Sequence, residues 1–559
     1  MADECLAERS GAACDEDARA LENRHSVSLS VVVGVDSRVE SRPAYPIGWG
    51  RACPEAGYEG RAMNQRRAVL HCNAGGEYGM GHLMRTLALG GAAHRRGWSV
   101  SVIGDIDEVG MSIARRMEPD LALDSSQGAA LLDSLADAAS DADVVHLDSY
   151  LDAPDLSSSK VLVSNMQDGP YGARAADLSI DANLGAERTF ERVELSRNAL
   201  VGLDVAVVRD QVLRRRDAPL RTTSSPRVLV VMGGSDPQGL TARVTRALDG
   251  FRHPLRVTVV DPRDRDEVRA AAADSSHETR VIGFTDDLPA IAREHDFVVT
   301  AAGTSVWDFA CMGLPMGLLC AVDNQRLGYE QVVSQGLATA LGEPPHADLE
   351  ARVIALESVL HDRAELAAQA TALRNAVDGL GTWRIVASWE QLVDTRQDAP
   401  RASRPMAVRS ATADDAPMLF DWRNDESTRA NSRSTGPLEW TSHVAWLGGA
   451  LLDRDRRLLI VESDGDPVAT ARWDRRSETD WEVSITMAPS HRGQGLASAV
   501  LAASEGALIL DAPSRLIASV HTENTASLRL FQRAGYLPHL PVDSGGFATF
   551  ARWRLAPVR

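Results

Sequence analysis

Lysine is almost missing from this sequence: its 559 residues include one, Lys160, and every other strongly basic residue is an arginine. Walker-type phosphate loops, Schiff-base enzymes and lysine-dependent kinases need a lysine within their motif. Lys160 follows three serines and has no glycine loop around it. These three classes are therefore excluded, and the shortage itself is typical of a high-GC coding bias.

Cysteines and long hydrophobic runs are also scarce. The six cysteines are scattered without a Cys-x-x-Cys pair, which is typical of reduced cytoplasmic proteins. No apolar run reaches the ~18–20 residues that span a bilayer, and the acidic first residues lack the features of a signal peptide. Acidic residues outnumber basic ones 78 to 59, for a net charge of −19, which argues against nucleic acid and anionic membranes as main partners. We expect a cytoplasmic protein with no membrane span and no metal.

Composition and hydrophobic pattern divide the chain into five segments. Residues 1–62 hold half of the cysteines and one apolar run, and Met63 directly precedes a buried strand pattern, so we expect a disordered extension or a misassigned translation start. In two series, 63–215 and 216–395, short β-branched runs then alternate with helical stretches. The runs lie at 98–103, 144–147, 160–164, 227–232, 255–260, 297–300 and 315–319. This alternation predicts two parallel sheets wound with helices and a ligand cleft between them. Residues 396–405 are polar and contain proline, as a linker does, and 406–559 form a last α/β unit.

The first strand pattern ends in a glycine turn that leads to a histidine. Gly79 and Gly81 precede His82, a helical stretch containing Arg85 follows, and Asn73 lies at the end of the strand. Glycines between a strand and a helix let the backbone approach a ligand, and the helix N-terminus favours a phosphate. His82 is a candidate general base near neutral pH, although the pattern alone fits a structural histidine equally well.

The second series contributes two further strand-to-helix turns. In a cleft, the turn at Gly303 would hold a diphosphate through backbone N–H groups, and Asp308, one helical turn later, could accept hydrogen bonds from ribose hydroxyls. For each motif taken alone, an ordinary turn remains the alternative. The candidate nucleotide-binding residues of this half are Gly233, Gly234, Ser235, Asp236, Gly303, Thr304, Ser305, Asp308, Asn324 and Gln325.

Taken together, residues 79–85, 232–236, 303–308 and 324–325 resemble the UDP-sugar hydrolase of pseudaminic acid biosynthesis. That family is related to MurG-type glycosyltransferases and shares their two-lobed GT-B fold. The resemblance implies hydrolysis of UDP-2,4-diacetamido-2,4,6-trideoxy-β-L-altrose to UDP and the free sugar, with His82 as the base that activates water. It also implies that the glycine turns, Arg85 and Asn73 bind the UDP-sugar and that Asp308 takes the ribose role. The family has Arg-x-Asp where this chain has 71–73, His-Cys-Asn, so another UDP-sugar or a transfer reaction stays open.

The last unit carries a second glycine loop between a strand and a helix. Its pattern Arg-x-x-Gly-x-Ala, at 492–497, resembles the pyrophosphate loop of GNAT-family N-acetyltransferases, and 516–536 resembles the family's late strand and closing helix. The resemblance implies acetyl-CoA as co-substrate. Glu482 is the candidate base, with a solvent-exposed strand carboxylate as the alternative, and Phe531 stands where the family often has a tyrosine acid. The implied acetyl-CoA-binding residues are Ile485, Met487, Arg492, Gly493, Gln494, Gly495, Leu496, Ala497 and Asn524.

The sequence thus predicts an α/β protein with GT-B-like two-lobed, doubly wound parallel sheets and a C-terminal GNAT domain. The leading hypothesis is a bifunctional enzyme that N-acetylates a UDP-linked amino sugar and hydrolyses the UDP-sugar, as in the pseudaminic acid pathway. One alternative is a GT-B glycosyltransferase with an acetyltransferase domain, acting on a surface glycan or natural product. A second is a sugar-nucleotide sensor without activity.

Overall fold

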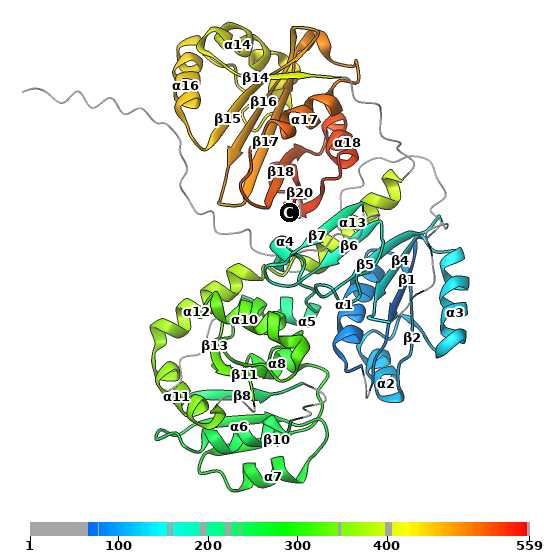
Figure 1. Ribbon diagram of the computed structural model, residues 1–559, viewed down its shortest axis with the longest axis vertical. Coiled ribbons are helices and arrows are strands. Elements are labelled where there is room, and N and C mark those ends of the chain that lie inside the picture. The colour runs from blue at the N-terminus through cyan, green and yellow to red at the C-terminus, as the bar shows by residue number, and fades with distance from the viewer. Residues whose placement is uncertain are drawn as a thin grey trace, which may run out of the picture. The chain divides into compact units, whose positions relative to one another are not determined.

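A computed structural model of the chain describes residues 65–75, 78–151, 153, 156, 160–189, 197–217, 225–233, 236, 238–344, 348–396 and 405–555. These residues form three β-sheets that belong to one compact unit of the chain (Figure 1). Most of the expected linker and all of 1–62 lie outside the described residues, and so do Gly234 and Ser235.

The first sheet is a parallel sheet of seven strands in the order β3-β2-β1-β4-β5-β6-β7. Alternate residues of β1 enter different cores: Leu70 packs with α1 and α13, whereas Val69 packs with α3, so helices cover both faces. The strands are β1 (Arg67–Cys72), β2 (Ser99–Gly104), β3 (Ala122–Ser125), β4 (Val144–Asp148), β5 (Leu162–Met166), β6 (Leu178–Asp181) and β7 (Asn198–Val201). The helices are α1 (Gly81–Arg95), α2 (Glu108–Met117), α3 (Gly128–Ser140), α4 (Ala186–Thr189), η1 (Leu203–Val205) and α5 (Asp210–Leu213).

The second sheet is parallel as well, with six strands in the order β10-β9-β8-β11-β12-β13. The valine-rich strand β8 sends Val228 toward α6 and α11 and Leu229 toward α9 and α12. The strands are β8 (Arg227–Val231), β9 (Arg256–Val260), β10 (Glu278–Ile282), β11 (Phe297–Ala301), β12 (Met316–Leu319) and β13 (Thr339–Gly342). The helices are α6 (Leu240–Leu248), α7 (Asp266–Ala273), α8 (Leu288–Ala292), α9 (Ser305–Met312), η2 (Asp323–Gln325), α10 (Arg326–Ser334), α11 (Leu349–His361), α12 (Arg363–Ala376) and α13 (Gly381–Thr395).

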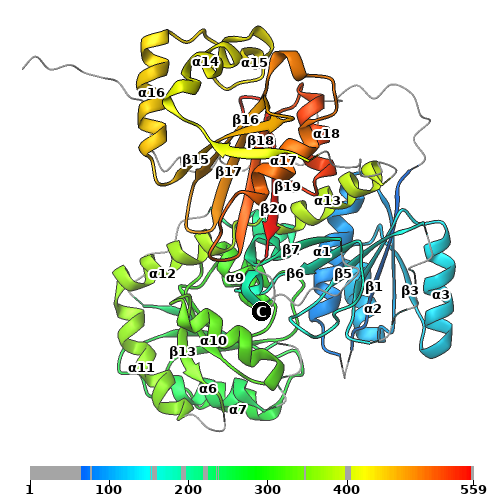
Figure 2. The same cartoon turned by 45° about the horizontal axis from the view of Figure 1, so that its top comes forward.

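The third sheet is mixed, with the order β14-β15-β16-β17-β18-β20-β19 and one parallel pair, β17 with β18. One face packs against α14 and α16 through Leu458, and the other against α17 and α18 through Leu459 (Figure 2). The strands are β14 (Ala407–Ser410), β15 (Arg456–Ser463), β16 (Asp466–Arg475), β17 (Asp480–Met487), β18 (Ser514–His521), β19 (Leu537–Leu540) and β20 (Phe547–Arg554). The helices are η3 (Ala413–Asp415), α14 (Ala416–Asn424), α15 (Glu426–Ala430), α16 (Trp440–Leu452), η4 (Pro489–His491), α17 (Ala497–Gly506) and α18 (Thr525–Arg533).

Helix α13 follows the second sheet in sequence but packs on the first. At its start, Thr382 Oγ1 donates to Val208 O at 2.9 Å and accepts from Val208 N at 3.2 Å. A Cβ atom on Gly381 would lie 2.2 Å from Ala206 O, so the contact between these segments requires glycine. The chain therefore passes between the two lobes at two places that touch one another.

The same helix also contacts the third sheet. The buried Arg384 donates two hydrogen bonds to Asp378, one to Asp204 O and one, from Nε at 2.8 Å, to His539 O of β19. Gln391 Nε2 donates to Tyr536 O at 2.7 Å, and Leu537 belongs to the hydrophobic core of the first lobe. The C-terminal domain and the first lobe thus share a continuous packed interior.

Candidate functional site

A histidine–aspartate pair lies at the carboxyl edge of the first sheet. Strand β1 ends at Cys72, which is in register with Asp148 at the end of β4. Gly79, with φ +71°, turns the chain so that α1 begins at Gly81 and His82 lies in its first turn. His82 Nδ1 is 2.7 Å from Asp148 Oδ1, and 1% of the Asp148 side chain is exposed. Parallel strands whose carboxyl ends meet at one edge thus bring together two residues that are far apart in the sequence.

Arg85 holds the same carboxylate from the next turn of α1. Its Nε donates to Asp148 Oδ2 at 2.8 Å and its Nη2 to Oδ1 at 2.6 Å. Burial alone would raise the pKa of Asp148, but the Arg85 charge and the hydrogen bonds from Arg85 and His82 lower that pKa overall. A charged Asp148 acts as acceptor, so the His82 proton resides on Nδ1 and the lone pair on Nε2. This arrangement prepares Nε2 to accept a proton.

A second carboxylate extends the array. Asp168 accepts from Arg85 Nη1 at 3.1 Å, from Tyr150 Oη at 2.6 Å and from Asn183 Nδ2 at 3.3 Å. Burial, followed by Asp168, raises the pKa of Tyr150, so the phenol stays protonated and donates. The Tyr150 ring meets the His82 ring edge-on, with centroids 4.7 Å apart. His82 is therefore fixed by a carboxylate on one side and an aromatic ring on the other.

Asp181 holds the residues on either side of this second carboxylate in place. It accepts hydrogen bonds from Asn183 N, from Asn183 Nδ2 at 2.8 Å and from Gly169 N. Burial raises the pKa of Asp181 to about 6 despite these donors. Asp181 thereby orients the asparagine that contacts Asp168.

Asn73 lies beside the array with both ends of its amide engaged. Its Nδ2 donates to Ser149 Oγ at 3.0 Å, and its Oδ1 accepts from Asp105 N at 2.9 Å. The side chain is buried. In the structure Asn73 joins the loops that follow β1, β2 and β4.

The start of α9 in the second lobe lies opposite the start of α1. A Cβ atom on Gly81 would be 3.3 Å from Thr304 Oγ1, so the two turns nearly touch. Gly303 and Thr304 precede the helix, whose first residue is Ser305. Asp308 is buried on α9 and accepts from Arg209 Nη2 at 2.6 Å and Nε at 3.1 Å, both at Oδ2. The first turn of α9 thus lies next to the turn that precedes His82.

The remaining predicted residues of the second lobe occupy supporting positions. Asp236 is buried and accepts from the backbone of Leu240 and Thr241 at the start of α6 and from Arg265 Nη1 at 2.8 Å. Gly233 has φ +81°, and Gln325 Oε1 accepts from Ala321 N. The side chain of Asn324, like Gly234 and Ser235, lies outside the described residues.

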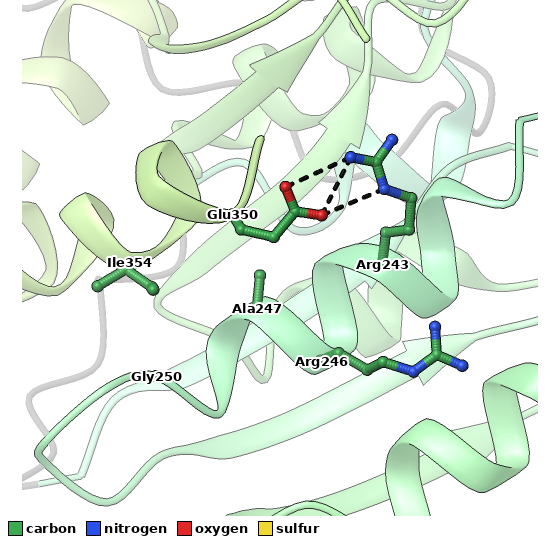
Figure 3. A pocket seen from close by; sticks show the side chains of 6 residues that line it. All are labelled: Arg243, Arg246, Ala247, Gly250, Glu350 and Ile354. Atoms are coloured by element: carbon green, nitrogen blue, oxygen red, sulfur yellow. Dashed lines mark hydrogen bonds and ion pairs between the residues drawn. The ribbon is translucent and has the colours of Figure 1, made fainter. Parts of the chain in front are cut away.

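A metal site and a surface hollow are two other kinds of candidate site. Among the described residues, no group of three or more His, Cys, Asp or Glu side chains is placed to hold a metal ion. A hollow of about 360 Å³ lies between α6 and α11, where Arg243 pairs with Glu350 at 3.0 Å (Figure 3). Its lining contains none of the strand-end residues described above, so we assign it no role in catalysis.

The C-terminal sheet opens between two of its strands. Strands β17 and β18 pair from Asp480 to Val483 and then separate, while β18 continues along β20 to His521. Residues 484–487 of β17, which include Ile485 and Met487, pair with β16 but, among the described residues, have no partner strand on the side of β18. A gap of this kind accepts an extended ligand that carries amide groups, as the pantetheine arm of CoA does.

The loop that follows β17 has the conformation of an anion site. Gly493 and Gly495 have φ +76° and +75°, Leu496 caps the helix, and α17 starts at Ala497. Gln494 Nε2 donates to Ser490 O. Arg492 lies at the same loop, but its Nη1 donates to Asp425 Oδ1 at 2.6 Å and its Nη2 to Thr428 Oγ1 at 2.7 Å. Its guanidinium therefore ties the loop to α15 in this structure.

Three further residues with predicted roles in this domain each contact another part of it. Glu482 Oε2 accepts from Arg476 Nε at 2.8 Å, and a quarter of its side chain is exposed. Asn524 caps α18 by accepting from Ser527 N at 3.1 Å. Phe531 is buried against the Tyr536 ring. Glu482 and two residues predicted to bind acetyl-CoA, Ile485 and Met487, lie on the same strand, β17.

Asp148, Tyr150 and Asp168 lie in two short stretches, 147–150 and 167–169, that supported the sequence resemblance, but none of the three was predicted as a site residue. Their partners are far away in the sequence. One signal was available, because Asp148 directly ends a buried strand and the ends of parallel strands gather at one edge.

Among the described residues, no helix is long and apolar enough to cross a membrane. Comparison with known proteins identifies the C-terminal domain: residues 406–537 match the family described as Acetyltransferase (GNAT) domain. The sheet topology and this match confirm the predicted fold class, with doubly wound parallel sheets before a GNAT domain.

The two-lobed part is similar to several sugar-related proteins. It is 25% identical over 179 residues to the spore coat polysaccharide biosynthesis protein SpsG of Bacillus subtilis (strain 168), covering 30% of this chain and half of that protein. It is 33% identical over 153 residues to the UDP-N-acetylglucosamine–N-acetylmuramyl-(pentapeptide) pyrophosphoryl-undecaprenol N-acetylglucosamine transferase of Thiobacillus denitrificans (strain ATCC 25259 / T1), covering 26% of this chain and 41% of that protein. The crystal structure of Acinetobacter baumannii MurG aligns with a TM-score of 0.43 at 17% identity over 58% of this chain and 98% of that one.

Proposed function

We propose that the protein is a bifunctional sugar-nucleotide enzyme. Its GNAT domain transfers an acetyl group from acetyl-CoA to the amine of a UDP-linked amino sugar, and its two-lobed part then hydrolyses the UDP-sugar to UDP and the free acetamido sugar. The names of the relatives from B. subtilis and T. denitrificans support a sugar substrate and a UDP-linked sugar, respectively. The sugar that the sequence resemblance implies is a 2,4-diacetamido-2,4,6-trideoxyhexose.

The observation that carries the hydrolytic half is the Asp148–His82 pair. Because Asp148 holds Nδ1, His82 Nε2 accepts a proton from water while the water oxygen attacks the anomeric carbon. The bond between that carbon and the β-phosphate oxygen breaks, and UDP leaves with the bonding electron pair. The proton stays on the imidazolium, which the Asp148 carboxylate stabilises.

The leaving diphosphate needs compensation for its negative charge. Backbone N–H groups at the start of α9, next to Gly303 and Thr304, supply it, because a helix N-terminus favours anions. Both hydrogen bonds from Arg209 end on Asp308 Oδ2, so among the described residues Oδ1 is the oxygen left to accept a ribose hydroxyl.

A cluster of arginines in the GNAT domain supports a phosphorylated acceptor. Burial, then Arg472 and Arg429, lower the pKa of Arg423 on α14. Among the described residues, Nη1 of Arg423 is buried without a hydrogen-bond partner. Arg472 is paired with Asp474 at 3.0 Å, so the buried Nη1 of Arg423 is the group that favours an acceptor carrying phosphate. The amine attacks the thioester carbon, CoA leaves as a thiolate, and Glu482 is the proposed acceptor of the amine's proton.

Mass spectrometry of the products tests the proposal directly. The protein is incubated with acetyl-CoA and a UDP-linked 2-acetamido-4-amino-2,4,6-trideoxy sugar, and the expected result is a gain of one acetyl group followed by release of UDP and the free diacetamido sugar. In the His82→Ala variant, acetylation should continue while UDP release stops. UDP release that is unchanged in this variant would contradict the assigned base.

Glycosyl transfer is the second candidate, and the transferase relative favours it. In that case the acetylated UDP-sugar accumulates in water alone, and UDP appears only after a sugar acceptor is added. The same assay with and without a mixture of acceptor glycans separates the two reactions.

A further inference from the structure

A tight turn fixes an exposed tyrosine beside the His82 array. Asp168 N donates to Tyr171 O at 3.0 Å, and Tyr171 N donates to Asp168 O at 3.2 Å. Gly169 and Gly172 have φ +60° and +72°, so the turn closes over these residues without strain. The Asp168 side chain is itself bound to Arg85 and Tyr150. The backbone of Tyr171 is therefore tied to the residue that organises the catalytic pair.

The Tyr171 ring continues the aromatic surface that begins at His82. Tyr150 meets His82 at 4.7 Å, and the Tyr171 ring centroid lies 5.8 Å from that of Tyr150. Relative exposures are 45% for Tyr150 and 55% for Tyr171. Large aromatic side chains that are both exposed and held in place offer apolar area to a ligand at low entropic cost.

We propose that Tyr171 determines sugar specificity in the two-lobed part, by packing its ring against the apolar face of the sugar that His82 acts on. The ligand class is a sugar with few hydroxyls on one face, such as a 6-deoxy acetamido sugar. Aromatic rings pack on apolar C–H groups, whereas a fully hydroxylated face would lose hydrogen bonds to water there. This inference rests on the proposed UDP-sugar hydrolase function.

Binding in a protein that cannot turn over its ligand tests the inference. Calorimetry compares the His82→Ala protein with His82→Ala/Tyr171→Ala and His82→Ala/Tyr171→Phe, using UDP and the UDP-diacetamido-trideoxy sugar as two separate ligands. Removing the ring should weaken binding of the UDP-sugar about two- to tenfold and leave UDP binding unchanged, because the ring contacts the sugar alone. Tyr171→Phe should bind both ligands like the parent.

Three outcomes contradict the inference. Equal UDP-sugar affinity with and without the ring, or an equal loss for UDP and UDP-sugar, would show that Tyr171 does not contact the sugar. Equal affinity of the His82→Ala protein for UDP and for the UDP-sugar would also show that Tyr171 does not contribute to sugar binding. Failure of the parent to bind UDP at all would instead overturn the proposed function, and with it this inference. Thermal unfolding of each variant checks that the fold is intact.

Discussion

Replacing Asp148 by asparagine is the sharpest test of the proposed hydrolytic mechanism. The substitution keeps the shape of the side chain and removes its charge, so Oδ1 can still meet His82 while the imidazolium loses its counter-ion. Asparagine can also donate an N–H to His82 Nδ1, which moves the imidazole proton to Nε2. Nε2 then lacks the lone pair with which it would accept a proton from water. Asp148→Asn should therefore act on catalysis more than on substrate binding.

The size of the effect follows from the contacts of the carboxylate. Asp148 accepts one hydrogen bond from His82 and two from Arg85, all between 2.6 and 2.8 Å. A hydrogen bond to a charged group contributes about 1.5–3 kcal/mol, and the bond to His82 strengthens as positive charge develops on the ring. Loss of that bond alone predicts a fall in kcat of about 10- to 150-fold, and the wrong tautomer raises the loss toward the ~10⁴-fold seen for the analogous change in Ser-His-Asp enzymes.

The assay follows UDP release from the acetylated UDP-sugar at saturating substrate. Acetyl transfer by the GNAT domain of the same molecules serves as an internal measure of correctly folded protein. Asp141→Asn is the matched control, because Asp141 is an exposed carboxylate paired with Arg67 at 3.5 Å. A kcat for Asp148→Asn within threefold of the wild type, with an unchanged pH profile, would refute the role of the pair.

The other predictions concern acid stability and acetyl transfer. Burial lowers the pKa of His146 from 6.5 to about 4. Between these pH values the unfolded chain therefore binds a proton that the folded protein does not. The free energy of unfolding falls as the pH drops, by up to about 3 kcal/mol in total. His146→Phe removes this group, so the melting temperature should decline less between neutral pH and about pH 5 than in the wild type; an equal decline would contradict the assignment. Glu482→Gln should lower the rate of CoA release, measured with a thiol reagent, about 10²-fold. Arg476→Gln, which frees the same carboxylate, should leave that rate unchanged or higher. Full activity of Glu482→Gln would show that Glu482 is not the base.

The sequence was informative where a strand is buried on both faces. The valine-rich pattern of β8 and β11 predicted these strands nearly residue by residue, and the runs at 98–103 and 315–319 match β2 and β12 within one residue. In the two parallel sheets the edge strands β3, β7, β10 and β13 were not predicted, and neither was β6 next to β7. β3 and β10 are short and half exposed, so their sequences carry little hydrophobic pattern, and β6 contains a buried serine and a buried aspartate.

The site was predictable only in part, for a similar reason. Glycine turns and His82 are local features that a sequence displays directly, whereas the partners of His82 depend on which strands lie side by side. Asp148 reaches His82 through the register of β1 with β4, which no single motif contains. Arg492 gives the opposite case: its motif predicts a phosphate contact, while the fold supplies Asp425 and Thr428 as partners.

The position of α13 has a consequence for dividing the protein. A gene fragment that stops in the polar segment after Thr395 would yield two lobes in which Arg384 Nε has lost its carbonyl acceptor and the first lobe has lost Leu537 from its core. A fragment that begins there would expose Leu537 and leave the carbonyls of Tyr536 and His539 without their donors from α13. Exchange of the GNAT domain for a relative with other specificity would thus succeed only if the surface of α13 is changed to match the new domain.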